Sequence, residues 1–328
     1  MDSLTQIILG VAVAHVGLRG KENWKKTIAL GALLGTLPDL DVYVSKILQD
    51  PLAEIELHRG FSHSILFFLL LSLVLTPLIK RFFKETSSVR LLITVFFILL
   101  THSLLDVFTT WGTQILWPLH TKFALKSIFV VDITYTIPLL MGLLLGLKNK
   151  RITFTYAGFF ISTLYLFWGL IAQTIVKNRV VEHFKLAYDK PIVNSTVKPT
   201  FSNSFLWNVI IQTNDGFYLS DRTLFEYDQM EFTYFSQNKN LINGINDENI
   251  DRLIAISENQ YVISQNEKGL VFNDLRFGLL KKDEADVQFA FSYQLVPTNK
   301  GYQVVEMPKD RKDGLKLLKN IWFRITGL

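Results

Sequence analysis

The stretch Ile152–Val176, ITFTYAGFFISTLYLFWGLIAQTIV, decides the fold of this 328-residue chain, because its 25 residues include no Asp, Glu, Lys or Arg. At 1.5 Å per residue, a helix of this length can cross a hydrocarbon core of about 30 Å. Hydrophobic residues make up 49% of the whole chain, and its mean hydropathy is +0.26. The sequence therefore predicts an integral membrane protein.

Five further apolar runs precede this stretch, and together they predict an α-helical membrane domain over residues 1–177 with about six membrane segments. Three runs have the length of a span, namely Phe61–Ile79, Val89–Phe108 and Ile128–Leu147. The first two, Leu4–Leu18 and Thr27–Leu37, are short and rich in Gly and Ala. They are expected to form either two thin spans or a re-entrant hairpin packed inside the bundle.

Basic residues predict the orientation of these segments. Eleven Lys and Arg residues lie between segments one and two, three and four, and five and six, whereas the opposite loops, 39–64 and 109–127, carry four. Loops rich in Lys and Arg stay in the cytoplasm. We therefore expect a multi-pass membrane protein with the N-terminus and everything after Val176 outside the cytoplasm.

Charge and composition exclude several classes of protein. The net charge of +5 arises within residues 1–176, where 15 Lys and Arg face 10 Asp and Glu, while residues 177–328 hold 19 of each. This distribution is typical of membrane loops, so no nucleic-acid partner is expected. The chain has no Cys, which excludes thiolate zinc sites, Cys nucleophiles and disulfides.

Residues 178–328 predict a small extracytoplasmic α+β domain. Phe201–Asn214 and Asp215–Asp221 flank the turn residues Asn214-Asp215-Gly216, a pattern typical of a hairpin. Further strands are expected at Met230–Ser236, Tyr261–Gln265, Gly269–Phe272 and Val287–Val296, and helices at Asn249–Ser257 and Gly314–Ile325.

Four polar elements interrupt the apolar half, and the predicted topology puts all of them at the outer membrane face. They are Pro38–Asp41 after segment two, His58–Ser64 at the start of segment three, His102–Asp106 at the end of segment four, and Asp132 at the start of segment five. Ionisable residues in membrane segments are costly and usually mark function. Since the topology follows from Lys and Arg alone, this coincidence predicts a shared site.

The candidate ligands in these elements are imidazoles and carboxylates, which suit a divalent metal ion. They are Asp39, Asp41, His58, His63, His102, Asp106 and Asp132. His102 and Asp106 are four residues apart and therefore share one helix face. Nitrogen and oxygen donors without sulfur favour Zn²⁺, with Mn²⁺ or Fe²⁺ as alternatives. Seven candidates exceed the four ligands of one zinc ion, so either two ions bind or some members support the others.

Each element also has a structural explanation when it is taken alone. The pair His102 and Asp106 can form a hydrogen bond within a helix, Asp39 and Asp41 can cap a turn after Pro38, and Asp132 can face water. The joint placement at one face favours the metal site. His15, His120 and His183 are left outside it.

Several motifs resemble those of the bacterial membrane-bound metal-dependent hydrolases. They are the opening MDSLTQI (1–7), GTLPDLD (35–41), HRGFSHS (58–64) and HSLLD (102–106) followed by TTWG (109–112), with NSFLW (203–207) and DLRFG (274–278) in the C-terminal half. The resemblance covers nearly the whole chain and implies metal-dependent hydrolysis of an unassigned substrate. The helical His/Asp site is also similar to that of zinc-dependent phospholipases C, which implies phosphoester hydrolysis. The chain has His15 where the resemblance leads us to expect an acidic residue.

The primary hypothesis is a multi-pass metal-dependent hydrolase of a bacterial inner membrane that acts on a lipid or lipid-linked (phospho)ester at the outer face. Asp41 is the predicted general base, and Arg59 is predicted to stabilise developing charge or to hold a phosphate. The alternative is a non-enzymatic envelope protein with a structural metal and a C-terminal binding module. A metal or proton transporter is disfavoured because the ligands cluster at one face. The sequence does not define the oligomeric state.

Overall fold

The computed structural model describes residues 1–20, 22–47, 50–225, 230–283, 286–299 and 301–308. The chain divides into two compact units, one of helices and one built mainly of strands. The helical unit contains Met1–Ile47, Leu57–Ile171 and Phe201–Ser204. The sheet unit contains Leu48–Glu56, Ala172–Thr200 and the chain from Phe205 onward.

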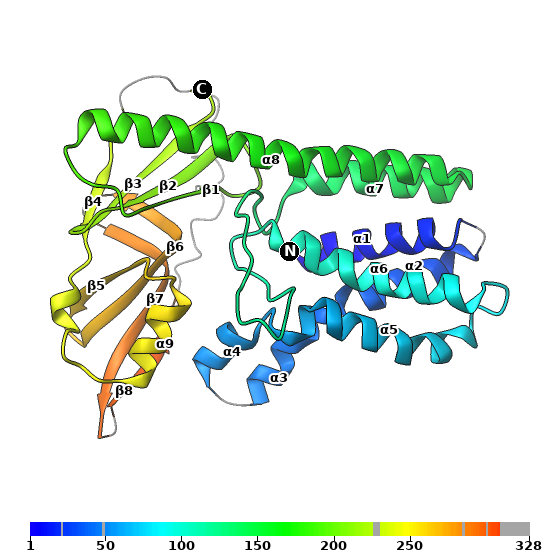
Figure 1. Cartoon of the computed structure of the whole chain (residues 1–328), viewed down its shortest axis with the longest axis horizontal. Coiled ribbons are helices and arrows are strands. Elements are labelled where there is room, and N and C mark those ends of the chain that lie inside the picture. Colours follow the sequence, from blue (N-terminus) through cyan, green and yellow to red (C-terminus); the bar gives the residue numbers. More distant parts are fainter. Residues whose placement is uncertain (21, 48–49, 226–229, 284–285, 300, 309–328) are drawn as a thin grey trace. The chain divides into compact units, whose positions relative to one another are not determined.

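The helical unit is a bundle around α6 (Figure 1). Its α-helices are α1 (Ser3–Gly17), α2 (Trp24–Thr36), α3 (Asp41–Ile47), α5 (Ile65–Lys80), α6 (Ser88–Val107), α7 (Ile133–Asn149) and the first part of α8 (Ile152–Ala187), with the short 3₁₀ helices η1 (Pro38–Leu40) and η2 (Phe61–His63). Leu91, Val95, Ile98 and Leu99 of α6 are fully buried, because α1, α2 and α5 pack around this helix. This packing fixes the helix that carries His102 and Asp106.

Helices α1 and α2 pack with their backbones close together. A Cβ atom on Gly10 would lie 2.2 Å from the carbonyl oxygen of Gly31, a separation that no side chain tolerates. Glycines allow this approach between membrane helices. The Gly- and Ala-rich composition of these two segments therefore allows their close packing. Helix α2 ends at Thr36, directly before η1, so its position fixes where η1 lies.

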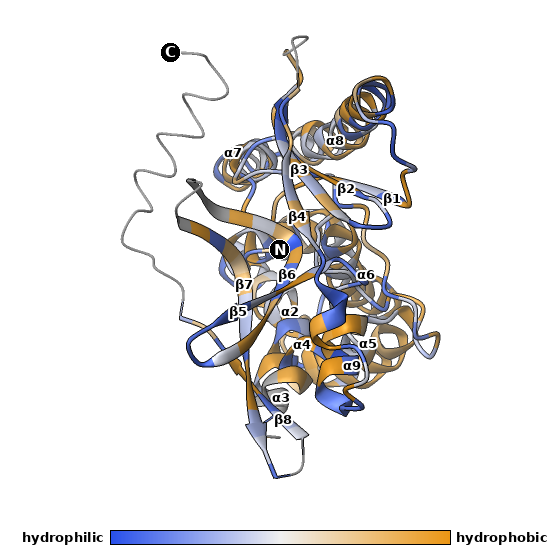
Figure 2. Cartoon of the chain, turned by 90° about the vertical axis from the view of Figure 1, so that its left-hand side faces the viewer, coloured by the Kyte–Doolittle hydropathy of each residue, from blue (hydrophilic) through white to orange (hydrophobic). Residues whose placement is uncertain are grey.

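An α-helix forms most of each of the six predicted segments, but six spans are not confirmed. Among the described residues, α6 and α8 are long and apolar enough to cross a membrane, and the pair Leu52–His63 and Ile65–Lys80, bent by 62°, gives a third candidate. Helices α1 and α2 extend only about 20 Å at 1.5 Å per residue. Large apolar side chains remain exposed on α5, namely Leu66, Leu69, Leu70 and Leu73, and orange, hydrophobic residues prevail on this helix in Figure 2. Such an apolar surface is suited to contact with lipid.

The sheet unit contains two four-stranded antiparallel sheets, so the predicted α+β character of this part is confirmed (Figure 1). One sheet has the order β1 (Asn194–Pro199), β2 (Leu206–Gln212), β3 (Gly216–Thr223) and β4 (Thr233–Ser236). The other has the order β5 (Tyr261–Asn266), β6 (Gly269–Asp283), β7 (Asp286–Thr298) and β8 (Gly301–Glu306). The same unit holds α4 (Pro51–Leu57) up to Glu56, the helix α9 (Glu248–Ile256) and the 3₁₀ helix η3 (Lys239–Leu241).

The predicted hairpin is present as β2 and β3, whose end residues Gln212 and Phe217 pair across the turn. Two strands were not predicted, β1 and β8, and β6 is much longer than the expected Gly269–Phe272. The predicted helix Gly314–Ile325 lies outside the described residues. The predicted domain boundary at 177/178 falls inside α8, which continues as one helix to Ala187.

Candidate metal centre

Four side chains of the helical unit bring one ligand atom each to a common point. These atoms, from Asp39, His63, His102 and Asp106, all lie within 4.8 Å of one another. Asp39 comes from η1, which begins at Pro38; His63 ends η2; and His102 and Asp106 project from the same face of α6. The i, i+4 spacing on a helix and two 3₁₀ turns thus build the cluster.

The distances between these atoms fit a tetrahedral ion. Nε2 of His63 lies 3.5 Å from Asp39 Oδ1 and 3.6 Å from Asp106 Oδ2, and Nε2 of His102 lies 3.4 Å and 3.5 Å from the same two oxygens. Ligands about 2.0–2.1 Å from a tetrahedral zinc ion lie about 3.3–3.4 Å apart. All four histidine–carboxylate separations are therefore close to the edges of one coordination tetrahedron.

Three of these four atoms are buried without a hydrogen-bond partner among the described residues. They are Nε2 of His63, Nε2 of His102 and Oδ2 of Asp106. An unsatisfied buried polar atom costs about 1–3 kcal/mol, so a converging set of three needs an explanation. A cation at their centre would satisfy all of them, and the donor set therefore fits a divalent metal.

The imidazoles are held in the orientation that metal binding requires. His102 Nδ1 lies 2.7 Å from the carbonyl oxygen of Gly35, which can only accept a hydrogen bond, so Nδ1 is the donor. In the neutral imidazole, Nε2 then carries the lone pair that a metal needs. His63 Nδ1 lies 3.3 Å from Asp41 Oδ2 and 3.0 Å from Ser62 Oγ. A carboxylate or carbonyl behind a ligating imidazole is the usual arrangement that fixes its tautomer and raises its basicity.

Asp41 supports this arrangement from behind the four ligands. Its Oδ1 lies 3.0 Å from His58 Nδ1, while its Oδ2 accepts hydrogen bonds from Arg59 N and Ser62 Oγ, both at 2.9 Å. Burial raises the pKa of Asp41, but its contacts with His58 and His63 outweigh burial and hold the pKa well below the ordinary carboxyl range. Asp41 and His58 therefore join the site as neighbours of His63, and neither is among the four converging ligands.

Arg59 lies against the same cluster and is buried. Its Nε is 3.1 Å from Asp106 Oδ2, and its Nη1 donates a 2.8 Å hydrogen bond to Thr109 Oγ1. Its backbone adopts φ +60, a left-handed conformation that non-glycine residues seldom take and that often marks functional sites. At Gly60, a Cβ atom would lie 2.8 Å from the carbonyl oxygen of Leu57, which explains the Arg-Gly pair in this tight turn.

Two groups at the start of the chain also contact Asp106, and neither was predicted from the sequence. The α-ammonium group of Met1 forms a buried ion pair with Asp106 Oδ1, and Gln6 Nε2 lies 3.2 Å from the same oxygen. The side chain of Asp2 accepts from Thr5 N and caps α1, which holds this end in place. The only sequence signal for these contacts is the opening motif MDSLTQI, which takes part in the family resemblance.

Asp132 is placed differently from the four converging residues. It caps α7, since its Oδ1 accepts from the backbone N–H groups of Thr134 and Tyr135 and its Oδ2 accepts from the hydroxyl of Tyr165. The structure thus gives this carboxylate a full set of partners as a helix cap and does not bring it into the four-residue group.

The three remaining histidines of interest are also apart from the group. His15 Nδ1 makes a 2.9 Å hydrogen bond with Thr155 Oγ1, His120 is exposed in the loop after α6, and His183 lies on α8. None of these three histidines belongs to the four-residue group found among the described residues.

A bundle of apolar helices with a histidine–carboxylate cluster defines a membrane protein with a candidate metal site. The chain belongs to the family of YdjM inner membrane proteins, which it matches over residues 1–176. It is 24% identical to the uncharacterized protein YfhP of Bacillus subtilis (strain 168) over 227 residues, 67% of each chain. It is 33% identical to the inner membrane protein YbcI of Escherichia coli (strain K12) over 105 residues, 31% of this chain and 60% of that protein. No solved structure matches it.

Proposed function

We propose that this protein is a membrane-bound metal-dependent hydrolase whose centre consists of Asp39, His63, His102 and Asp106. The observation that carries the proposal is the convergence of four ligand atoms at separations typical of a tetrahedral ion. Among these atoms, Nε2 of His63 and Nε2 of His102 are buried without a hydrogen bond in the described part of the chain. The family supplies the inner-membrane context, and the resemblance of the motifs suggests hydrolysis. A purely structural hydrogen-bond network would not leave these atoms without partners.

The donor set favours Zn²⁺ among the divalent ions. Two imidazole nitrogens and two carboxylate oxygens at tetrahedral spacing suit zinc, and Mn²⁺ or Fe²⁺ remain alternatives because they take the same donors. A bound ion would polarise a phosphoryl or acyl oxygen and lower the pKa of a bound water to about 7. Burial raises the pKa of Asp39, but its contacts with the imidazoles of His102 and His63 outweigh burial and hold this pKa well below the ordinary carboxyl range. The Asp39 carboxylate is therefore ionised, as a metal ligand must be.

The protein's own residues supply access and positioning. The side chain of Asp39 is 23% exposed, whereas those of His63, His102 and Asp106 are 1% exposed or less, so the centre opens on the Asp39 side. Arg59 balances the charge of Asp106 and can stabilise negative charge that develops on a substrate. Because Asp41 already accepts from several donors, we assign it the positioning of His63 in preference to the general-base role that the sequence suggested.

The surroundings of Asp39 suggest a lipid or lipid-linked substrate. Leu40 and Phe61, which neighbour the ligands Asp39 and His63 in η1 and η2, are 48% and 52% exposed. Trp117 lies against Phe61 with ring centroids 6.2 Å apart and is also exposed. Apolar and aromatic side chains beside a polar centre are typical of a site that receives an amphipathic molecule at the membrane interface.

The test is hydrolysis by the purified full-length protein of a phospholipid, a lipid-linked pyrophosphate and a simple phosphodiester. We expect turnover of at least one phosphoester that stops with a chelator and returns with Zn²⁺. The His102→Ala variant should show no chelator-sensitive turnover. If the metal-loaded protein hydrolyses none of these substrates, the enzymatic proposal fails.

The orientation is also a proposal, and it makes its own prediction. Reporter fusions after Lys84 and after Lys150 should report a cytoplasmic location, because these loops carry most of the basic residues. Fusions near Thr121 and after Phe201 should report an extracytoplasmic location. An external signal at Lys84 together with a cytoplasmic signal at Phe201 would reverse the topology and put the centre on the inner face.

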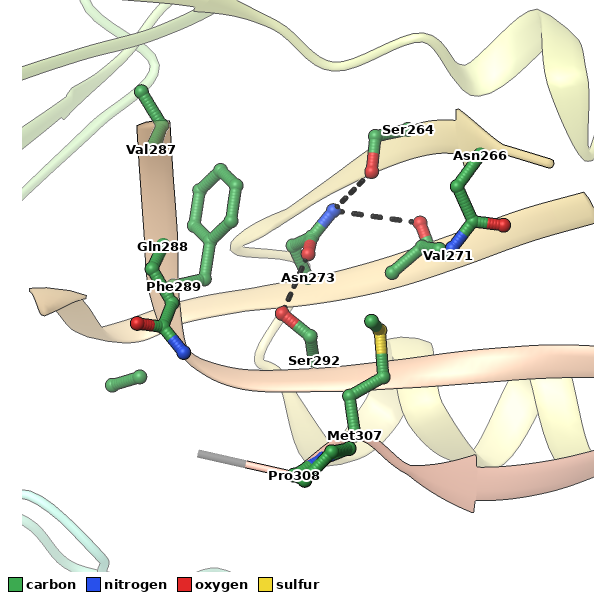
Figure 3. A pocket seen from close by; sticks show the side chains of 11 residues that line it. Ser264, Asn266, Val271, Asn273, Val287, Gln288, Phe289, Ser292, Met307 and Pro308 are labelled. Carbon is green, nitrogen blue, oxygen red and sulfur yellow. Dashed lines mark hydrogen bonds between the residues drawn. The ribbon is translucent and has the colours of Figure 1, made fainter. Parts of the chain in front are cut away.

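A second candidate function is a binding protein with a structural metal, and a pocket in the sheet unit favours it. This pocket of about 250 Å³ lies on β5, β6 and β7, and its described lining residues carry no charge (Figure 3). Asn273 donates to Ser264 Oγ and accepts from Ser292 Oγ, while Phe289 and Met307 supply apolar walls. A metal with four protein ligands and no open position would favour this function over hydrolysis.

A further inference from the structure

The segment between the two ligand-bearing motifs belongs to the other unit of the protein. Asp39 and Asp41 precede it and His58 and His63 follow it in the helical unit, but Leu48–Glu56 is part of the sheet unit. The chain therefore leaves the helical unit after Ile47 and returns at Leu57. None of the residues in this excursion belongs to the four-residue group.

Helix α4 is fixed to the sheet unit by both apolar and ionic contacts. Leu52 is 1% exposed and packs in one cluster with Ile250 and Leu253 of α9. Arg252 of α9 binds two acidic residues that flank Leu52. Its Nε and Nη2 lie 2.9 Å and 2.7 Å from the two Glu56 carboxylate oxygens, and Nη2 lies 2.8 Å from Asp50 Oδ2.

This geometry is a planar fork on a carboxylate, which is the strong form of an ion pair. Two parallel N–H···O bonds to Glu56 specify direction as well as distance, and Lys cannot reproduce them. The contact with Asp50, which directly precedes α4, holds the start of this helix. Arg252 thus holds both ends of this short helix.

The ends of the same segment meet at the candidate metal centre. Asp41 and His58 are joined by the 3.0 Å contact of Oδ1 with Nδ1, and the backbone N–H of Arg59 donates to Asp41 Oδ2 at 2.9 Å. Glu56 is only two residues before His58 in the chain. A movement of α4 is therefore transmitted through two peptide units to the residues that orient His63.

We propose that Arg252 is a positioning residue for the metal centre, acting through α4 on the pair Asp41 and His58. The inference rests on the proposed metal site and extends it by giving the sheet unit a defined task. Fixing α4 restricts His58 and Arg59, which follow it directly in the chain and contact Asp41. Less conformational entropy is then lost when Asp41 and His63 are oriented for the metal. A change in the sheet unit that loosens α4 then weakens metal binding.

The test measures Co²⁺ binding to the full-length protein, because Co²⁺ reports its coordination through its visible absorption. Arg252→Glu reverses the charge that holds α4. We expect a Co²⁺ affinity about 2- to 30-fold lower, the usual range for coupling between distant sites, with an altered absorption band. The charge-swapped variant Arg252→Glu/Asp50→Lys/Glu56→Lys should recover much of the affinity. Lys190→Ala removes the exposed ion pair with Asp215 in the same unit and should leave the affinity unchanged.

Two outcomes separate this inference from the proposed function. If the wild-type protein binds no Co²⁺, the metal site itself is refuted. If the wild-type protein binds Co²⁺ and Arg252→Glu increases hydrogen exchange in α4 without changing affinity or spectrum, only the positioning role is overturned. Should Arg252→Glu fail to fold, the charge-swapped variant decides, because a folded swap with a protected α4 must recover much of the wild-type affinity if the inference holds.

Discussion

His102→Ala is expected to lower the affinity for Zn²⁺ by at least about 100-fold. Structural zinc sites gain about 10–16 kcal/mol from four ligands, so one ligand contributes several kcal/mol. The loss also leaves Asp39 and Asp106 as close carboxylates with less compensation, which should lower the stability of the helical unit. The measurement is the metal content of purified protein after equilibration against a competing chelator, together with its thermal unfolding.

Two matched controls sharpen this test. His120→Ala removes an exposed histidine of the same unit and should retain full metal content. Asp132→Ala removes the side chain that caps α7, so it should reduce stability by about 1 kcal/mol and keep the metal. Equal metal content in the wild type and in His102→Ala would show that the ion, if any, binds elsewhere.

Asp41→Asn is expected to lower metal affinity about 10- to 100-fold, the usual effect of removing a group that orients a ligating histidine. The asparagine amide keeps one acceptor oxygen but points N–H donors at groups that now donate to Asp41, including Arg59 N and Ser62 Oγ. His63 then loses the carboxylate that fixes its tautomer. The measurement is again a metal-affinity titration, accompanied by the rate of phosphoester hydrolysis at saturating metal.

This variant distinguishes two roles for the same residue. If Asp41 positions His63, Asp41→Asn loses affinity, and excess Zn²⁺ restores much of the rate. If Asp41 is the general base, the variant keeps its affinity and loses about 10²–10⁴-fold in rate at any metal concentration. Ser62→Ala, which removes one donor to the same carboxylate, should have a much smaller effect on both quantities.

The helices of the membrane part could be predicted because their signal is local. A run such as Ile152–Val176 has no charged residue. Lipid can surround such a helix, so its prediction does not depend on contacts with other parts of the chain. The shared helix face of His102 and Asp106 could be predicted for the same reason, because it depends only on their i, i+4 spacing. The β2–β3 hairpin was also predicted from a local signal, the turn residues Asn214-Asp215-Gly216.

The composition of the site was only partly readable, because it depends on contacts between distant segments. The sequence could not tell that Asp132 accepts from the backbone of its own helix and from Tyr165. Both Asp39 and Asp41 were predicted as candidate ligands. That Asp39 converges with His63 while Asp41 contacts His58 is decided where η1 meets η2 and α6. The contact of α4 with α9 also joins residues far apart in the chain, so no local sequence pattern predicts it.

The most direct test of the metal centre is anomalous X-ray scattering recorded at the zinc edge from crystals of the full-length protein. A centre built from these four ligands predicts one peak about 2.0–2.2 Å from Asp39, from Nε2 of His63 and His102, and from Asp106 Oδ2, which is the range of zinc–ligand bonds. The peak should vanish in His102→Ala and persist in His120→Ala. A zinc-loaded crystal whose anomalous peak lies away from these four atoms, or that shows no peak there at all, would contradict the proposed centre.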